Sequence, residues 1–227
     1  MCSSDLFWVA PLVQPAPYDP VAQFVPIVMI NNAPNVLVIP PSVAVSSVKE
    51  LVALAKAKPG QLNYASGAAG VVSHLAGEQF KAMTETNIVR VPFGGTGDGL
   101  RAMLSGQVQV MFPAALSAMP LAKAGKLKAL GVATLKPSPL TPGLPTIAES
   151  GLPGYESGAG TALFAPAKTA PAIINQLNAA VRTYLARPEV TENLEKQGLE
   201  VTASTPTEMA EIIKNHMSKL GKMIKDA

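Results

Sequence analysis

Hydrophobic positions recur along the chain with two alternating spacings, one typical of strands and one typical of helices. Short β-branched apolar runs between Asn and Pro residues predict buried strands at 27–30 and 36–39. Apolar residues at i, i+3, i+4 and i+7 predict a helix over about 48–58, behind a capping-box pattern at 47–50. Residues 7–26 contain many prolines, so we expect them to form an irregular lead-in.

The order strand, small-residue turn, helix then occurs twice in succession. The first copy has a strand at 62–65 and an apolar helix face over 75–83. The second has a strand at 88–92, a glycine-rich turn and a helix for which Asp98 is the predicted N-cap. The alternation continues with a strand at 108–112, a helix at 115–124 and a strand at 129–133. Such alternation predicts a mainly parallel sheet covered by helices, which is an α/β fold.

The last third of the chain is predicted to be a long connection followed by helices. Residues 136–171 are rich in Pro and Gly, with one short strand expected at 163–165. Apolar spacing predicts helices at 173–185 and 189–197. A capping box at 205–208, with proline at the first helical position, predicts a final helix.

The two small-residue turns are the candidate functional feature of the sequence. The first N–H groups of a helix have no intrahelical partner and lie at the positive end of its dipole, so an open turn there can bind an anion. Ligands of parallel sheets bind beyond the carboxyl ends of the strands, so neighbouring strands would bring both turns to one carboxylate. The alternative is that small residues only let helices pack closely on the sheet. The candidate ligand-binding residues are Ser66, Gly67, Ala68, Gly70, Val71, Val72, Gly94, Gly95 and Thr96.

Composition and charge argue against several other classes of protein. The 227 residues suffice for one large or two small domains, and the net charge is only +3. The lysines are scattered and residues 1–48 have neither Lys nor Arg, so we do not expect nucleic-acid binding. Cys2 is the sole cysteine and the two histidines are isolated, so we predict no disulfide, no metal site and no cofactor. No apolar run reaches the ~20 residues that a membrane span needs.

A small serine hydrolase is the enzymatic alternative. It would use Ser66, His74 and Asp98. Ser66 lies in Tyr-Ala-Ser-Gly-Ala, which does not match the G-x-S-x-G pattern, and His74 follows too closely along the chain. We therefore expect His74 to hydrogen-bond the turn or the helix start instead. Neither turn matches a nucleotide-binding glycine motif.

An ordered set of short motifs resembles the solute-binding receptors of tripartite tricarboxylate transporters, the Bug receptors. The resemblance covers nearly everything from Tyr18 to the C-terminus. The matching segments are Tyr18-Asp19-Pro20, Phe24-Val25-Pro26-Ile27, Lys56-Ala57-Lys58-Pro59-Gly60-Gln61-Leu62-Asn63-Tyr64-Ala65-Ser66, His74-Leu75-Ala76-Gly77-Glu78, Val91-Pro92-Phe93, Gly106-Gln107-Val108, Ala124-Gly125-Lys126-Leu127, Pro145-Thr146-Ile147-Ala148-Glu149 and Gly151-Leu152-Pro153-Gly154.

This resemblance implies a non-catalytic periplasmic receptor with a two-lobed, type II periplasmic binding protein-like fold. Such a receptor closes on a small carboxylate and delivers it to membrane transporter subunits; a ligand sensor for a signalling system is the alternative. We expect residues 7–41 and 166–227 to form the first lobe, residues 42–165 to form the second, and residues 1–6 to be a non-native scar. The resemblance further implies an incomplete first lobe, an N-terminal truncation with no signal peptide, and a monomer when complete.

The first turn departs from the family pattern at two positions. Ala68 stands where the family usually has Gly, and we expect alanine to resist a positive φ there. Val71 stands where the family usually has a small hydroxyl residue, so one hydrogen-bonding side chain is expected to be missing.

Overall fold

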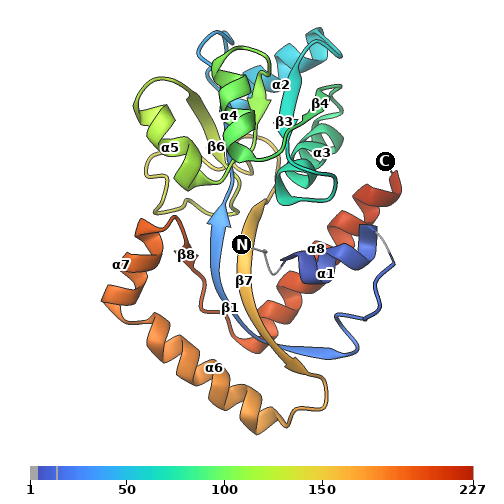
Figure 1. Cartoon of the computed structure of the whole chain (residues 1–227), viewed down its shortest axis with the longest axis vertical. Helices are drawn as coiled ribbons and strands as arrows, with labels where there is room; N and C mark the ends of the chain where they lie inside the picture. The colour runs from blue at the N-terminus through green and yellow to red at the C-terminus, as the bar shows by residue number, and fades with distance from the viewer. Residues whose placement is uncertain (1–4, 14, 227) are drawn as a thin grey trace. The chain divides into compact units, whose positions relative to one another are not determined.

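The computed structural model describes residues 5–13 and 15–226 of the chain, which divide into two compact units (Figure 1). Unit 1 comprises Met1–Ala33 and Ala159–Ala227, and unit 2 comprises Pro34–Gly158. Both units combine sheet and helices, as the predicted α/β fold class requires. Four of the six residues interpreted as a scar, 1–4, lie outside the described residues, whereas Asp5 and Leu6 belong to a helix.

Unit 2 is built on a five-stranded sheet in the order β4-β3-β5-β2-β6. Strand β3 is parallel to both β4 and β5, whereas β2 is antiparallel to β5 and β6. The prediction of a mainly parallel sheet is therefore wrong for β2, because an apolar run of four buried residues carries no signal for strand direction. The strands are β2 Val36–Ile39, β3 Asn63–Ser66, β4 Val89–Pro92, β5 Val110–Met111 and β6 Lys128–Val132.

Helices cover both faces of this sheet, and successive residues of β3 point to opposite faces. Tyr64 packs in the hydrophobic cluster that contains Phe80 of α3, whereas Ala65 packs in the one that contains Met103 of α4. The apolar spacing of the sequence predicted these helix faces in part, because Phe80 and Met103 are buried as expected whereas Met83 and Leu104 are exposed. The helices of unit 2 are α2 Val48–Ala57, α3 Val72–Thr84, α4 Thr96–Leu104 and α5 Ala115–Lys123.

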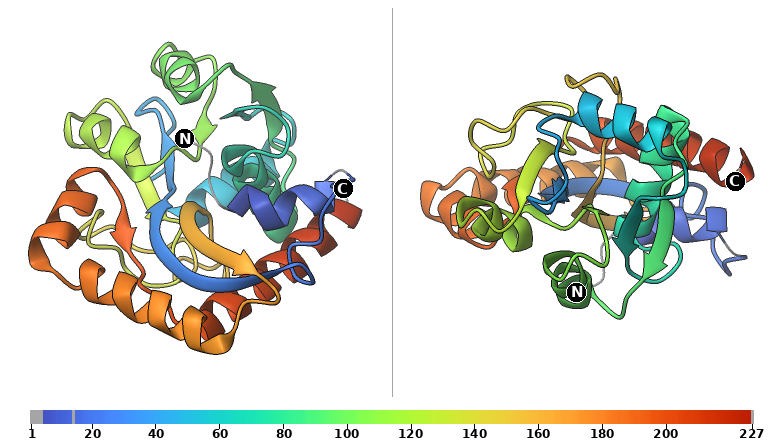
Figure 2. Two further views of the ribbon diagram at one scale, coloured as in Figure 1. Left: turned by 60° about the horizontal axis from the view of Figure 1, so that its bottom comes forward. Right: turned by 90° about the horizontal axis from the view of Figure 1, so that it is seen from above.

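Unit 1 contains a three-stranded sheet in the order β7-β1-β8, whose long strands β1 and β7 curve side by side (Figure 2). The Asn178 side-chain amide of α6 donates to the carbonyls of Ile27 at 2.8 Å and Ser204 at 2.9 Å, which joins a helix to β1 and to the segment before α8. The elements are α1 Asp5–Val13, β1 Phe24–Pro34, β7 Gly158–Pro166, α6 Pro171–Leu185, α7 Pro188–Lys196, β8 Glu200–Val201 and α8 Pro206–Asp226.

The expected irregular lead-in is wrong at its start, because α1 is a helix with Pro11 inside it. Trp8 of this helix is fully buried, and the ring of Phe7 stacks on that of Tyr18 with centroids 5.0 Å apart. Burying aromatic side chains contributes about 1.5–3 kcal/mol each, which offsets the roughly 3 kcal/mol cost of proline inside a helix.

The boundaries between the two units differ from the lobe boundaries expected from the sequence. The divisions fall at 33/34 and 158/159 instead of 41/42 and 165/166. Strand β2 belongs to the sheet of unit 2, and β7 begins five residues before the strand expected at 163–165. Apolar runs mark the strands, but they do not tell which sheet a strand joins.

Candidate ligand-binding site

The two small-residue turns lie side by side because their strands are neighbours. Strands β3 and β4 pair in parallel with Ser66 opposite Pro92, so both turns leave the same edge of the sheet. The Phe93 N–H donates to the Ser66 carbonyl at 2.8 Å, which joins the start of the second turn to the first. The site predicted from the sequence required the strands before the two turns to be neighbours, and in unit 2 they are.

Side chains from α3 hold the first turn in its conformation. The Gly67 N–H donates to Ser73 Oγ at 3.1 Å, and the Gly70 N–H donates to His74 Nδ1 at 3.0 Å. His74 thus bonds the turn, as expected from the sequence. Gly70 has a φ of +82°, which only glycine adopts readily.

The departures from the family pattern have different structural outcomes. Glu85 and Ala203 are the non-glycine residues with positive φ among those described, so the strain expected at Ala68 is absent. Val71 is the N-cap of α3 and makes no side-chain capping hydrogen bond, and the loss of a side-chain donor to a ligand at this position stays a prediction.

Four backbone donors of the first turn are left without a partner. Within the described part of the chain, the N–H groups of Ala68, Ala69, Val72 and Ser73 make no hydrogen bond. Ala68 and Ala69 are exposed, and the other two belong to the first turn of α3. These are the orphan donors of a helix N-terminus, and they are open to an acceptor from solvent.

The second turn also presents open backbone donors. Its N-cap is Gly95, and no described atom accepts from the N–H groups of residues 94–98. Asp98, predicted as the N-cap, instead lies in the first turn of α4 and forms an ion pair with Arg101. The prediction failed because Gly95 already has the extended backbone of an N-cap, with φ −177°, and needs no capping side chain.

Close packing explains some glycines of these segments but not Gly95 or Gly97 of the second turn. A Cβ on Gly77 would lie 2.2 Å from the Tyr64 ring, and one on Gly99 would lie 2.8 Å from Met111 Cε. These two glycines let α3 and α4 pack on the sheet. A Cβ on Gly95 or Gly97 would meet no atom within 4 Å, so the space above the second turn is open.

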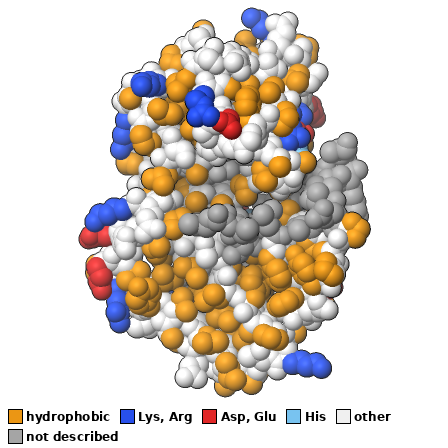
Figure 3. Space-filling view, in the orientation of Figure 1, with side chains coloured by type: hydrophobic (Ala, Val, Ile, Leu, Met, Phe, Trp, Pro, Cys, Tyr) orange, Lys and Arg blue, Asp and Glu red, His pale blue; other side chains and the backbone are white. Residues whose placement is uncertain are grey.

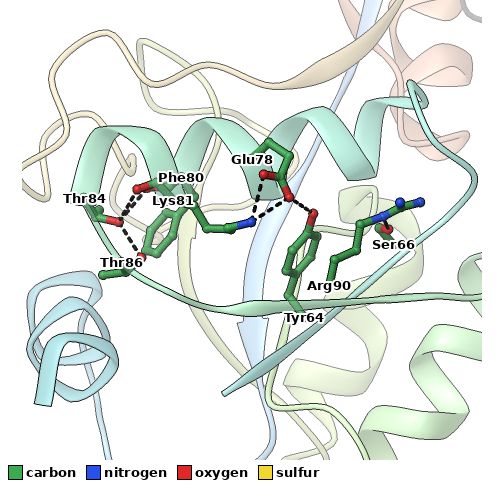
Figure 4. A network of polar contacts seen from close by, with 8 residues as sticks. All are labelled: Tyr64, Ser66, Glu78, Phe80, Lys81, Thr84, Thr86 and Arg90. Atoms are coloured by element: carbon green, nitrogen blue, oxygen red, sulfur yellow. Dashed lines mark hydrogen bonds and ion pairs between the residues drawn. The ribbon is translucent and has the colours of Figure 1, made fainter. Parts of the chain in front are cut away.

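Arg90, which no sequence pattern singled out, bonds the first turn through its guanidinium from strand β4 (Figure 4). Its Nε donates to Ser66 Oγ and its Nη2 donates to the Gly67 carbonyl, both at 2.8 Å. The Ser66 hydroxyl donates in turn to the Gly67 carbonyl at 3.1 Å, and Ser66 is only 2% exposed. The hydroxyl expected to face a ligand is thus committed within the loop. The register of two parallel strands would have been needed to find this contact.

Tyr64, Glu78 and Lys81 form a second polar group beside Arg90 and Ser66, on the same face of the sheet (Figure 4). The Tyr64 hydroxyl donates to Glu78 Oε1 at 2.5 Å, and Lys81 Nζ lies 2.8 Å from the other oxygen of Glu78. Burial and the Glu78 carboxylate raise the pKa of Tyr64. Burial alone would raise the pKa of Glu78, but the hydrogen bonds from Lys81 and Tyr64 lower it overall.

The imidazole of His74 is held neutral by its surroundings. Burial lowers its pKa first, and the positive charges of Arg90 and Lys81 lower it further, against the opposing effect of Glu78. A neutral ring agrees with the geometry, because Nδ1 accepts the Gly70 N–H and so carries no proton.

The structure does not assemble the hydrolase suggested by Ser66, His74 and Asp98. Ser66 is bonded by Arg90, His74 is bonded by Gly70, and Asp98 pairs with Arg101, so no nucleophile–base pair exists among these residues. Within the described residues, no group of three or more His, Cys, Asp or Glu side chains could hold a metal ion. No described helix is long and apolar enough to span a bilayer.

Two other hollows differ from the turns in chemistry. One, of about 390 Å³, lies within unit 1 between α6, α7 and strands β1 and β7, and most of its lining is apolar. The other, of about 460 Å³, lies within unit 2 and is bordered by Lys49, Lys56 and Glu85. Apolar side chains are widely spread over the lower part of the face in Figure 3. Neither hollow includes the open backbone donors of the two turns.

The chain is similar in sequence and in structure to known proteins. Over residues 1–227 the chain matches the tripartite tricarboxylate transporter family receptor, TctC. The chain belongs to the TctC receptor family. Members of the TctC and Bug families are solute-binding receptors and not enzymes. This finding confirms the resemblance seen in the motifs.

Two relatives of this TctC chain are longer than the chain itself. It is 32% identical over 209 residues to a UPF0065 protein of the tcbD-tcbE intergenic region of Pseudomonas sp. (strain P51), covering 92% of this chain and 62% of that protein. It is 29% identical over 215 residues to Protein BugT of Bordetella pertussis, covering 95% and 66%. The chain thus spans less than two thirds of these relatives.

Solved TctC-like structures confirm the fold class. The R. palustris protein Rpa4515, solved with adipate, is 33% identical with a TM-score of 0.78, covering 98% of this chain and 75% of that one. MatC from Rhodopseudomonas palustris, solved with bound malate, is 29% identical with a TM-score of 0.73, covering 96% and 75%. A TctC solute binding protein from Polaromonas, at 20% identity, has a TM-score of 0.89, covering 99% and 76%.

Proposed function

We propose that this chain is part of a periplasmic receptor that binds a small carboxylate through the two turns of unit 2 and delivers it to a membrane transporter. The observation that carries the proposal is the pair of adjacent helix N-termini with open backbone donors, those of Ala68, Ala69, Val72 and Ser73 and those of residues 94–98. The two units would correspond to the two lobes of such a receptor.

A carboxylate suits these donors better than a neutral ligand does. Its oxygens only accept hydrogen bonds, and a bond between a charged acceptor and a backbone N–H contributes roughly 1.5–3 kcal/mol. The positive ends of two helix dipoles add to the attraction. Adipate and malate, which accompany the two R. palustris relatives, are both dicarboxylates, and we propose this class of ligand for the present chain.

The space above the second turn allows a test that does not depend on the core. Gly95 has an extended backbone that any residue can adopt, and a Cβ there meets no atom within 4 Å. Gly95→Val should therefore leave the fold intact while its side chain blocks the approach of a ligand. Ala170→Val is the matched control, because Ala170 is an exposed N-cap of α6 in unit 1.

The experiment is calorimetric titration of the chain and both variants with adipate and malate. We expect wild type and Ala170→Val to bind at least one dicarboxylate and Gly95→Val to bind it at least tenfold more weakly. Binding that is equal in all three proteins would place the ligand elsewhere. An absence of binding in wild type would argue against a carboxylate receptor in this chain.

A further inference from the structure

The first turn is held by side chains from two different elements. Ser73 and His74, which accept from Gly67 and Gly70, belong to α3, the helix that the turn itself begins. Arg90 belongs to the neighbouring strand β4, where it pairs in register with Tyr64. Arg90 therefore links the turn to the sheet, whereas the other two side chains link it only to its own helix.

The guanidinium of Arg90 contacts two consecutive residues of the chain at the point where β3 ends. Nε and Nη2 donate in different directions, to a side-chain hydroxyl and to a backbone carbonyl, as Figure 4 shows for Ser66. A planar fork with fixed donor directions can make both bonds at once, whereas an ammonium group has no such fixed geometry. Nη2 donates to the Gly67 carbonyl, and this carbonyl belongs to the same peptide group as the Ala68 N–H.

Within the part of the chain that the structure describes, Arg90 forms no ion pair with a carboxylate. Ion pairs join Lys81 to Glu78, Arg101 to Asp98, and Lys196 to Glu192, and none of these three involves Arg90. A cation near a helix N-terminus is unfavourable for the dipole, whereas it is favourable for an anion bound at the same place. Arg90 is half-buried, so its field is screened less than that of an exposed side chain.

We propose that Arg90 is a positioning residue of the ligand site, which fixes the Gly67 carbonyl so that the open N–H groups of Ala68 and Ala69 face an anionic ligand. This inference rests on the proposed function and names a residue through which that site selects anions. Arg90 acts on the ligand by fixing the conformation of the first turn and by its positive charge. It does not need to contact the ligand itself.

The test uses two variants that separate the fork from the charge. Arg90→Lys keeps the charge and removes the fixed fork, whereas Arg90→Gln removes the charge and keeps one donor. Arg101→Lys is the matched control, because Arg101 is an exposed arginine whose described ion pair is with its own helix neighbour Asp98. Thermal unfolding of each variant shows whether it is folded.

The first measurement needs no ligand. Amide hydrogen exchange followed by NMR should show faster exchange of the Gly67 and Gly70 N–H groups in both Arg90 variants, and no change in Arg101→Lys. The second measurement is the titration of His74 by NMR, with His216→Gln as the background that removes the other histidine. We expect the pKa of His74 to rise in Arg90→Gln and to stay closer to wild type in Arg90→Lys, because only the former loses the nearby charge.

The third measurement is titration with adipate. We expect affinity to fall about tenfold in Arg90→Lys, because the turn is no longer fixed, and further in Arg90→Gln, because the nearby positive charge is also lost. Unchanged exchange at Gly67 in both variants would overturn the positioning role, whether or not adipate binds. Faster exchange with unchanged affinity would also overturn it. Failure of wild type to bind any dicarboxylate would count against the proposed function alone. The hydrogen-exchange rates and the pKa of His74 are measured without ligand and do not depend on dicarboxylate binding.

Discussion

Gly77 of α3 offers a quantitative test of how the helix is seated on the sheet. A Cβ at this position would lie 2.2, 2.6 and 2.8 Å from three atoms of the Tyr64 ring. The ring has little freedom to move, because Tyr64 is 1% exposed and its hydroxyl is bonded to Glu78 at 2.5 Å. The clash must therefore be relieved by a shift of α3 away from β3.

We expect Gly77→Ala to lower the free energy of unfolding by about 2 kcal/mol. Overpacking of a core costs roughly 1–3 kcal/mol, and a ring fixed at both ends places this site at the upper end. The higher helix propensity of alanine offsets at most about 1 kcal/mol of this destabilisation. The displacement of α3 would also move Ser73 and His74, the residues that bond the first turn.

Urea unfolding of Gly77→Ala, compared with Gly97→Ala, measures this effect. Gly97 lies in the first turn of α4, and a Cβ there meets no atom within 4 Å, so its replacement should be neutral or stabilising. A loss of less than about 0.5 kcal/mol in Gly77→Ala would refute the close packing of α3 on Tyr64.

Three further predictions concern single polar contacts. Tyr64→Phe removes the hydrogen bond to the Glu78 carboxylate and should cost about 1.5–3 kcal/mol in urea unfolding, with the pKa of Glu78 rising as a bond that lowers it is lost; an unchanged midpoint would contradict this. Asn178→Leu leaves the buried carbonyls of Ile27 and Ser204 without their donor and should cost about 2 kcal/mol or more, whereas exposed Asn193→Leu should not. The pKa of His74 lies below its ordinary 6.5, so the unfolded chain takes up this proton first and the stability associated with His74 falls as the pH drops below about 6.5. The stability difference between wild type and His74→Gln should therefore shift against wild type between pH 7.5 and pH 5, and a constant difference would show that His74 does not titrate as described.

The capping contacts at Ser47 and Thr205, which depend on residues close in the sequence, were predicted from the sequence, whereas the N-cap expected at Asp98 was wrong. Thr205 and Glu208 form both bonds of the expected capping box, at 2.7 and 3.2 Å. Ser47 accepts the Glu50 N–H as expected, although the Glu50 carboxylate returns to Ser46 instead of Ser47. These contacts span three or four residues, so the chain itself brings the groups together.

Features that depend on distant pairing were missed or wrong. The direction of β2, the pairing of β8 with β1 and the contact of Arg90 with Ser66 all follow from which strands are neighbours. The helix α1 was missed because local proline preference opposes it, whereas the burial of Trp8 and the stacking of Phe7 on Tyr18 favour it. The adjacency of the two turns was conditional on their strands being neighbours, and the parallel pairing of β3 with β4 meets that condition.

The backbone amides of the two turns provide the most direct test of the proposed carboxylate site. An NMR titration of the isotope-labelled chain with adipate would follow every assigned N–H group. We predict saturable shifts concentrated at Ala68, Ala69, Val72 and Ser73 and at residues 94–98. Saturable shifts concentrated elsewhere, for example around the apolar hollow between α6 and α7, would contradict the account.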